Sequence, residues 1–190
     1  MNDSVIRRYV LAALCVLQFD RVIDKLMALR TRVRLARYRR QGAEVRFQGQ
    51  GGYEIEIAGN LAKFRIHPTS HLKSDTFIEC SGGVSIGRYF HPGRGLTIFS
   101  TNHNTKSTTL IPYDDADLPR PVTIGDAVWV GANVTIAPGA SIGDGAIIGM
   151  GSVVRGTVPK CAIVRGNPAQ VVGFRDVAVF DALYEQGKFN

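Results

Sequence analysis

Four histidines are the side chains of this chain best suited to moving a proton at neutral pH. An imidazole has an ordinary pKa of about 6.5, so it can take a proton from a hydroxyl group and return it within one reaction cycle. The four are His67, His71, His91 and His103. Each of the four is a candidate general base, and a satisfied surface histidine is the alternative interpretation for each.

The cysteines are three in number, and they are far apart in the sequence. They are Cys15, Cys80 and Cys161. An odd count without a CxxC pair argues against a disulfide framework and against a zinc site. We therefore expect no bound metal, and a chain that works in the reducing cytoplasm.

A six-residue repeat predicts the element that positions these side chains. An aliphatic residue recurs at every sixth position, at Ile124, Val130, Ile136, Ile142, Ile148 and Val154. A smaller residue precedes each one by two positions, at Val122, Val128, Val134, Ala140, Ala146 and Ser152. Such a short fixed period is typical of a hexapeptide solenoid, in which each unit forms one flat side and three units close a triangular coil.

Glycine follows the aliphatic residue in four of these units, at Gly125, Gly131, Gly143 and Gly149. We expect corners there with positive φ, which glycine adopts most cheaply. Upstream the period is looser, because Ile86 restarts the phase two residues late. Between Ile98 and Ile124 the spacing exceeds four repeats by two residues, which predicts a loop that leaves the solenoid. His103 lies in this loop.

The net charge of +7 lies entirely in the first 46 residues, where eleven Arg and Lys face four acidic residues. Apolar residues recur there at helical spacing, and no Pro or Gly occurs before Gly42. The uninterrupted apolar run in this segment is too short to span a bilayer, and the segment lacks the cleavage site of a signal peptide. We expect either a helix that caps the first coil or a basic amphipathic helix that contacts an anionic inner membrane face through residues 1–40. Nucleic-acid binding is disfavoured, because no recognition motif accompanies the charge.

These patterns divide the chain into three parts. A basic helical segment occupies residues 1–46, a mainly β solenoid with a protruding loop at 99–121 occupies 47–172, and a C-terminal tail occupies 173–190.

Residues 78–173 closely resemble the hexapeptide-repeat acyltransferases, above all the maltose, galactoside and colanic-acid type of O-acetyltransferase. The resemblance rests on Trp129-Val130-Gly131-Ala132-Asn133-Val134, Pro138-Gly139, Ile148-Gly149-Met150-Gly151-Ser152-Val153-Val154 and Gly166-Asn167-Pro168-Ala169. It implies a left-handed parallel β-helix, a homotrimer with active sites between neighbouring subunits, and acetyl-CoA as donor. The left hand comes from the resemblance alone, since crossovers are usually right-handed.

The resemblance also assigns roles to residues. In the family the general base is a histidine on the loop before the W-[IV]-G segment, which His103 matches here. Donor-site candidates are Trp129, Gly131, Ala132, Gly149 and Met150, with Arg155 and Arg165 side by side for the phosphates of CoA. Acceptor-side candidates are Ser81, Asn102 and Tyr113, because the aspartate that some members place on the preceding coil is replaced near Cys80-Ser81.

The resemblance predicts an acetyl-CoA-dependent O-acetyltransferase in surface polysaccharide biosynthesis. Its acceptor would be a sugar, a nucleotide-sugar or a lipid-linked glycan, in the cytoplasm or at the inner face of the membrane. The alternatives are N-acetylation of an amino sugar and acetylation of serine or of an antibiotic. A catalytically silent scaffold is the least favoured interpretation, since it would more naturally have lost the loop histidine.

Overall fold

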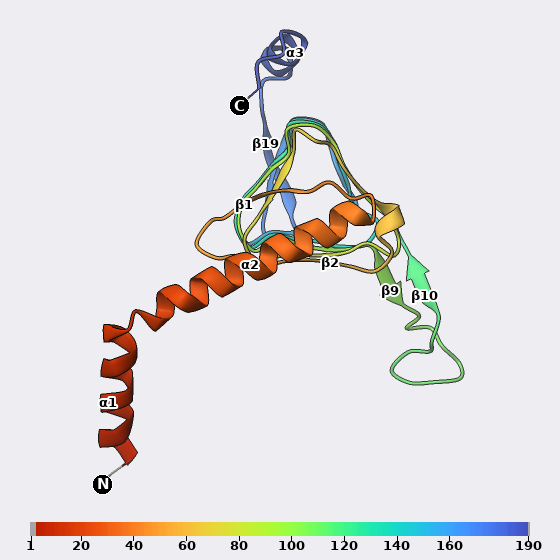
Figure 1. Cartoon of the computed structure of the whole chain (residues 1–190). Coiled ribbons are helices and arrows are strands. Elements are labelled where there is room, and N and C mark those ends of the chain that lie inside the picture. Colours follow the sequence, from red (N-terminus) through yellow and green to blue (C-terminus); the bar gives the residue numbers. More distant parts are fainter. Residues whose placement is uncertain (1–2, 190) are drawn as a thin grey trace.

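The computed structural model describes residues 3–189, most of which form a left-handed parallel β-helix with three flat faces (Figure 1). Face 1 consists of β3 (Phe64–Ile66), β6 (Val84–Ile86), β11 (Val122–Ile124), β14 (Ser141–Ile142) and β17 (Thr157–Val158). Face 2 consists of β7 (His91–Pro92), β12 (Trp129–Val130), β15 (Ile147–Ile148), β18 (Ala162–Arg165) and the antiparallel β19 (Gln170–Phe174). Face 3 consists of β2 (Ile55–Ala58), β5 (Thr76–Glu79), β8 (Thr97–Phe99), β13 (Thr135–Ile136) and β16 (Val153–Val154). The chain visits faces 1, 2 and 3 in that order in every coil, so we name the corners 1–2, 2–3 and 3–1.

The core consists of the residues that the six-residue period places inside. Ile124 pairs with Ile142, three units further on, which confirms that three units close one coil. Val128, Val130, Val134 and Ile136 are fully buried, because alternate residues of each short strand point inward. The prediction of a hexapeptide β-helix is confirmed.

The glycines after the aliphatic residues have a different role from the expected one. None of the four has positive φ; the left-handed conformation occurs two residues later, for example at Ala127 after Gly125 and at Asn133 after Gly131. The reason for glycine is close stacking of the coils: a Cβ on Gly131 would lie 2.6 Å from the backbone nitrogen of Met150 in the next coil. These positions therefore need the absence of a side chain rather than an unusual φ.

Both breaks in the period occur at the same corner. Ile66 pairs with Ile86, so this coil is two residues longer than the one in which Ile124 pairs with Ile142. The extra residues lie in the turn after β5, and the long loop leaves after β8, which pairs with β5. The loop begins and ends as a hairpin of β9 (Thr101–His103) and β10 (Asp117–Pro119), which projects from the 3–1 corner (Figure 1).

The N-terminal segment forms two helices, α1 (Asp3–Val16) and α2 (Phe19–Arg40). The continuous helix that the apolar spacing predicts is interrupted at Gln18, whose φ of 50° is left-handed. The second half of α2 covers the first coil: the buried Tyr38 hydroxyl accepts a hydrogen bond of 2.8 Å from the Ile57 N–H, and Arg34 donates to the Ile55 carbonyl at 2.9 Å. These contacts satisfy backbone groups of the edge strand β2, which has no strand on its outer side.

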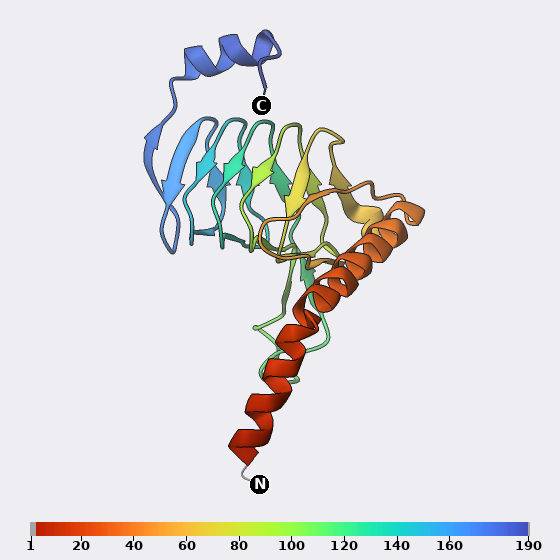
Figure 2. The ribbon, with the colours of Figure 1, turned by 60° about the vertical axis from the view of Figure 1, so that its left-hand side comes forward.

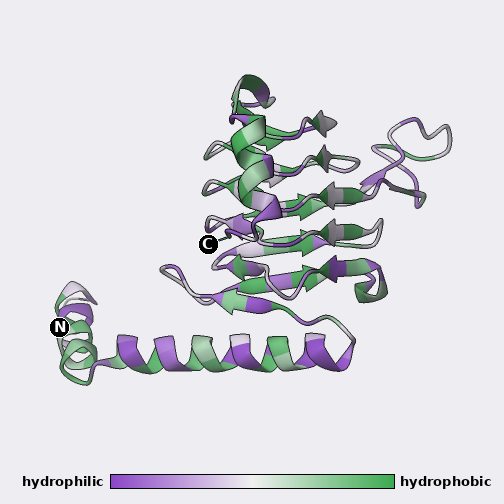
Figure 3. Cartoon of the chain, turned by 90° about the horizontal axis from the view of Figure 1, so that it is seen from above, coloured by the Kyte–Doolittle hydropathy of each residue, from purple (hydrophilic) through white to green (hydrophobic). Residues whose placement is uncertain are grey.

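The remainder of the N-terminal segment is exposed. α1 has no buried residue, and Figure 2 shows it extending away from the coils. Apolar side chains such as Tyr9, Leu17 and Leu26 are exposed from α1 to the first half of α2, and Figure 3 shows both hydrophobic and hydrophilic residues on α1. Within residues 3–189, no helix combines the length and the apolar character needed to cross a bilayer.

The other end of the solenoid is completed by α3 (Val177–Glu185), which follows β19 and returns over the 1–2 corner (Figures 1 and 2). The side chain of Asp176 caps this helix by accepting a hydrogen bond of 3.0 Å from the Val179 N–H. Lys160 pairs with Asp181 at 2.5 Å, and the Tyr184 hydroxyl donates to Asp126 at 2.5 Å. A smaller parallel pair, β1 (Arg46–Gln48) with β4 (His71–Lys73), and a 3-10 turn η1 (Leu61–Lys63) complete the N-terminal end.

Candidate active site

A cavity of about 580 Å³ lies where the hairpin leaves the 3–1 corner. Its polar lining comes from three segments: the turn after β5, the hairpin, and the end of face 3. These contribute Glu79, Ser81, Thr101, Asn102, His103, Asp117 and Arg155. The cavity therefore joins the two places at which the sequence departs from the six-residue period.

His103 ends β9 and is held on two sides by its own loop. The antiparallel register places Asp117 directly opposite, with 3.5 Å between His103 Nδ1 and Asp117 Oδ1. The ring stacks on Tyr113, with 4.0 Å between the ring centres and an angle of 5° between the planes. About half of the His103 side chain is exposed, so one face of the ring is supported while its edge remains open to a substrate.

Asp117 is an acid that can orient His103, which the sequence analysis left unassigned. A carboxylate near Nδ1 favours the tautomer with the proton on that nitrogen, and leaves the Nε2 lone pair for a substrate proton. Only the pairing of residues across the hairpin identifies Asp117 as the partner of His103. The sequence of a polar loop does not specify that register, so sequence analysis could not find this partner.

Glu79 is the second residue that sequence reasoning missed. Its carboxylate accepts hydrogen bonds from the Ser81 N–H at 2.7 Å and from the Thr101 hydroxyl at 2.8 Å, and it accepts a weaker one from the Ser100 N–H at 3.2 Å. Burial acts to raise the pKa of Glu79, but these donated hydrogen bonds outweigh it and lower the pKa below its ordinary value. A carboxylate thus occupies the acceptor side beside Ser81, where the sequence had indicated the loss of an aspartate.

The sequence-predicted acceptor residues come together around this cavity. Ser81 and Asn102 line it, and Tyr113 supports His103 from behind. The Asn102 side chain accepts a hydrogen bond of 3.0 Å from the His103 N–H, which fixes the start of the loop.

The donor-site candidates lie at a different corner. Gly131 and Ala132 follow β12 at the 2–3 corner, where Gly131 stacks on the backbone of Met150 and Gly149 stacks on Arg165 in successive coils. The Met150 side chain is 79% exposed, and Trp129, just before the corner, is 54% exposed. This corner lies at the opposite end of β13 from the His103 cavity.

The two arginines are separated rather than adjacent. Arg155 follows β16 and lines the His103 cavity at the 3–1 corner, whereas Arg165 ends β18 at the 2–3 corner. Within one chain the two arginines thus start from opposite ends of the short strand β16, and their assignment to the phosphates of CoA stays a prediction. Arg165 remains with the other donor-site candidates, and Arg155 joins the acceptor cavity.

His71, His91 and Cys80 are placed by packing contacts away from the open part of the cavity. His71 is buried and meets the ring of His91 edge-on at 5.0 Å. Cys80 follows Glu79 but is fully buried, and burial raises the pKa of its thiol to about 11, so it cannot act as a nucleophile at neutral pH. In the described part of the chain no three His, Cys, Asp or Glu side chains are grouped to hold a metal ion.

Comparison with known proteins supports this assignment of the fold. Residues 121–156 match the family described as bacterial transferase hexapeptide, six repeats. This part of the solenoid is therefore similar to the transferase hexapeptide repeat. The predicted resemblance to hexapeptide-repeat acyltransferases is thereby confirmed. No curated protein matches the chain.

Solved structures of acyltransferases share the architecture. A maltose O-acetyltransferase from Clostridium difficile 630 is 27% identical with a TM-score of 0.50, over 68% of this chain and 64% of its own. This chain therefore spans less than two thirds of that enzyme. A hexapeptide-repeat acetyltransferase from Vibrio cholerae, solved with acetyl-CoA, is 21% identical with a TM-score of 0.58, over 81% and 88% of the two chains. A variant of the N-acyltransferase AntD from Bacillus cereus, solved with a dTDP-amino sugar and CoA, is 18% identical with a TM-score of 0.56, over 70% and 72%. The last two likenesses concern the fold alone.

Proposed function

We propose that this protein is an acetyl-CoA-dependent O-acetyltransferase that modifies a hydroxyl group of a sugar or glycan. The observation that carries the proposal is His103, supported by Asp117 and Tyr113 at the mouth of a polar cavity on a transferase hexapeptide solenoid. The likeness to a maltose O-acetyltransferase favours a sugar hydroxyl as the acceptor. N-acetylation of an amino sugar is the alternative, because a general base beside a polar cavity would serve an amine as well as a hydroxyl group.

The reaction follows from the groups in the cavity. His103 Nε2 takes the proton of the acceptor hydroxyl while the oxygen attacks the acetyl carbonyl carbon. The tetrahedral intermediate then expels the CoA sulfur, and the imidazolium returns the proton to it. Asp117 stabilises the positive ring during this cycle, and its position near Nδ1 makes it a positioning residue rather than a proton carrier.

The acceptor side is built to hold hydroxyl groups. The ionised Glu79 carboxylate has accepting capacity, and Thr101 and Ser81 are held on it by hydrogen bonds. Arg155 adds a positive charge at the other rim of the cavity, which suits an acceptor that bears a phosphate or a carboxylate. A nucleotide-sugar or a lipid-linked glycan has this combination of hydroxyl groups and negative charge.

The placement of the two half-sites supports a closed homotrimer. The donor corner and His103 lie at opposite ends of the strands of face 3, so a donor molecule along the 2–3 corner would meet the histidine of a neighbouring subunit more readily than that of its own. Cyclic symmetry would repeat this contact three times and leave no corner unpaired. Trp129, Gly131, Ala132, Gly149, Met150 and Arg165 would then line the donor in the cleft.

We further propose that the exposed N-terminal helices rest on the inner face of the membrane, where lipid-linked glycans of surface polysaccharides are assembled. Exposed apolar side chains along α1 can enter the boundary between headgroups and acyl chains. The excess of Arg and Lys in residues 1–46 would be attracted to anionic headgroups. This would place the enzyme in the cytoplasm beside its acceptor.

The proposal is tested by measuring thiol release from acetyl-CoA with a panel of acceptors. The panel contains free sugars, nucleotide-sugars, amino sugars and serine. We expect a nucleotide-sugar or glycan to stimulate release, and the product to lose its acetyl group in mild alkali, as an ester does and an amide does not. An alkali-stable product would replace O-acetylation by N-acetylation, and no release with any member would refute the proposal.

A further inference from the structure

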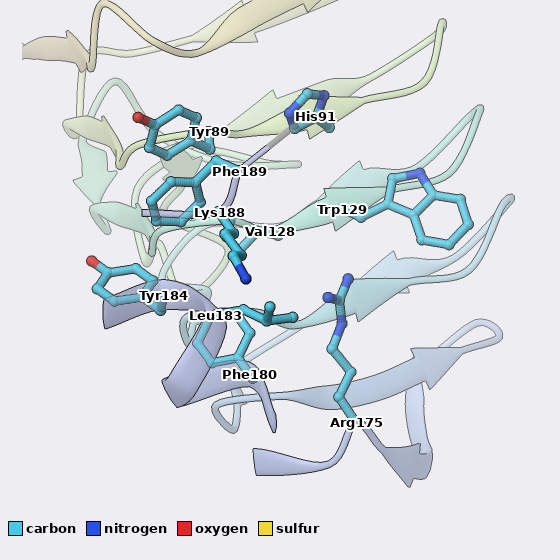
Figure 4. A pocket seen from close by; sticks show the side chains of 11 residues that line it. Tyr89, His91, Val128, Trp129, Arg175, Phe180, Leu183, Tyr184, Lys188 and Phe189 are labelled. Atoms are coloured by element: carbon cyan, nitrogen blue, oxygen red, sulfur yellow. The ribbon is translucent and has the colours of Figure 1, made fainter. Parts of the chain in front are cut away.

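A second cavity of about 350 Å³ lies on the other side of the solenoid, between α3 and face 2. Figure 4 shows it as a space between a cluster of aromatic rings on one side and Trp129 on the other. The cluster is formed by Tyr89, Phe180, Tyr184 and Phe189. The cavity shares only the strand of Trp129 with the donor corner, and it shares no residue with the His103 cavity.

The walls are planar and rigidly held. Tyr89 stacks on Phe189 with 3.9 Å between ring centres and 7° between planes, and Phe189 meets Tyr184 edge-on at 5.3 Å. Tyr184 is anchored in turn by its hydrogen bond of 2.5 Å to Asp126. Opposite this cluster, the indole of Trp129 is more than half exposed. A flat aromatic group can therefore stack here without any rearrangement of the walls.

The charges in the cavity are all positive. Arg175 and Lys188 both line it, and no ion pair involves either of them within residues 3–189. The Arg175 Nε is buried and has no hydrogen-bond partner in that part of the chain. In Figure 4 the guanidinium of Arg175 and the ammonium of Lys188 both extend toward the space between Leu183 and Trp129. A buried donor without a partner costs free energy, which a bound anion would recover.

We propose that this cavity binds a nucleotide, with the base against the aromatic walls and the phosphates on Arg175 and Lys188. Its volume is within the range of small-ligand sites, and its lining has their usual form of an apolar surface with a few convergent polar groups. Arg175 and Lys188 have no carboxylate partner in the described part of the chain, so their charges are available to a phosphate group. The aromatic rings can stack on a planar base, which a simple sugar does not offer.

The nucleotide can belong to either substrate of the proposed transferase. It is the adenine nucleotide of CoA or the nucleotide of a nucleotide-sugar acceptor. Binding itself is independent of acetyl transfer; only the assignment to one of these two sources rests on the proposed function.

Trp129 is the only tryptophan in the chain, so its fluorescence reports on ligands at this cavity and at the adjoining donor corner, and the Arg175 and Lys188 variants described next distinguish the two places. The full-length His103→Ala protein is titrated with UDP, with CoA and with inorganic phosphate, after correction for absorption by the nucleotides. We expect at least one of the two nucleotides to change the emission with a dissociation constant below about 1 mM, and phosphate alone to bind at least about tenfold more weakly. Absence of any nucleotide effect up to 10 mM would overturn the proposal.

The variants Arg175→Gln and Lys188→Gln locate the phosphates. Each should weaken nucleotide binding about tenfold, the equivalent of one charge-assisted hydrogen bond. Arg65→Gln, on face 1, is the matched control. Because Lys188 is exposed, its variant keeps the test valid even if Arg175→Gln does not fold. Unchanged binding in the Lys188 variant and in any folded Arg175 variant would overturn the proposal.

Steady-state kinetics of the active enzyme then distinguish the sources. An increase in the KM for acetyl-CoA alone in Lys188→Gln identifies the donor nucleotide. An increase in the KM for the acceptor alone identifies a nucleotide-sugar.

Discussion

At the scale of single residues, His103 lies at the centre of the proposed chemistry, and its removal is the first test. His103→Ala should lower kcat by about 10² to 10⁴, the usual span for loss of a general base, while the dissociation constant for acetyl-CoA is retained. Calorimetry measures the binding and thiol release measures kcat. His67→Ala is the control, because the His67 side chain is hydrogen-bonded within its own turn, to Thr69 at 2.9 Å, and does not line the His103 cavity. Near-normal turnover in His103→Ala would remove the assignment.

Asp117 is the positioning residue for that histidine, and it can be tested separately. Asp117→Asn should lower kcat about fivefold, equivalent to about 1 kcal/mol for an exposed pair, with the KM for acetyl-CoA unchanged. Asp117→Glu should recover part of the loss, because it restores the carboxylate. Asp115→Asn, two residues earlier in the same loop, is the control. If the asparagine variant changes only KM, Asp117 contacts a substrate instead of orienting His103.

His71 is a buried residue that makes the stability of the fold depend on pH. Burial, followed by the nearby charges of His91, Lys73 and Arg46, lowers its pKa from 6.5 to about 4. The unfolded chain therefore binds a proton between these values that the folded chain does not, so stability falls as the pH is lowered from 6.5 to about 4. The loss attributable to His71 reaches about 3 kcal/mol at the lower end of this window.

His71→Leu should therefore flatten this part of the stability profile. The measurement is the free energy of unfolding in urea at several pH values between 7 and 4. His67→Leu is the matched control and should keep the slope of the unmodified protein. An unchanged slope in His71→Leu would show that the histidine accepts its proton without cost in the folded state.

At the scale of elements, the sequence predicted the solenoid well because the residues that recur with the six-residue period are also the residues that form the core. Each buried aliphatic residue is required by the coil above and below it, as in the pairing of Ile124 with Ile142. The functional parts were harder to predict. Asp117 meets His103 only through the register of a hairpin, and Glu79 enters the cavity only because two breaks in the period stack at one corner.

The N-terminal helices show another limit of sequence reasoning. A cap and a membrane contact were treated as alternatives for one amphipathic face. The structure divides the segment instead: residues near Tyr38 contact β2, while α1 and the first half of α2 have exposed apolar side chains. A periodicity plot could not show this division, since both halves have similar apolar spacing.

The exposed half leads to the prediction for membrane binding. The intact protein should bind vesicles that contain phosphatidylserine, with binding that rises with the acidic lipid fraction and falls with salt, because each Arg or Lys near the surface contributes about 1 kcal/mol and is screened. Vesicle sedimentation at several salt concentrations measures this. Neutral vesicles should bind weakly.

Deletion of residues 1–18 is the matched control for this prediction. It removes α1 but leaves Tyr38 and Arg34 on β2, so the solenoid should keep its unfolding midpoint while vesicle binding is weakened. Vesicle binding that is absent, or that does not respond to salt, would remove the membrane contact from the proposal.

At the scale of the whole molecule, the three corners of the solenoid have three different roles. α3 covers the 1–2 corner, the hairpin with His103 leaves the 3–1 corner, and the 2–3 corner presents Gly131 and Gly149 (Figure 1). In the proposed function, the 2–3 corner and the 3–1 corner are two incomplete halves of a site that lie on different edges of one chain. Rotation of identical chains about a threefold axis is the simplest arrangement that brings one half of each chain against the other half of the next.

This arrangement predicts complementation between two inactive variants. His103→Ala loses the base, and Met150→Glu places a negative charge on the donor corner, where the exposed side chain has no packing to lose. After mixing and reassembly in equal amounts, three quarters of trimers would be mixed and each would contain one intact site, so activity should return to about a quarter of the unmodified level. A site within one chain would give no recovery. A mass near the 20.7 kDa of one chain in light scattering under assay conditions would likewise refute the trimer.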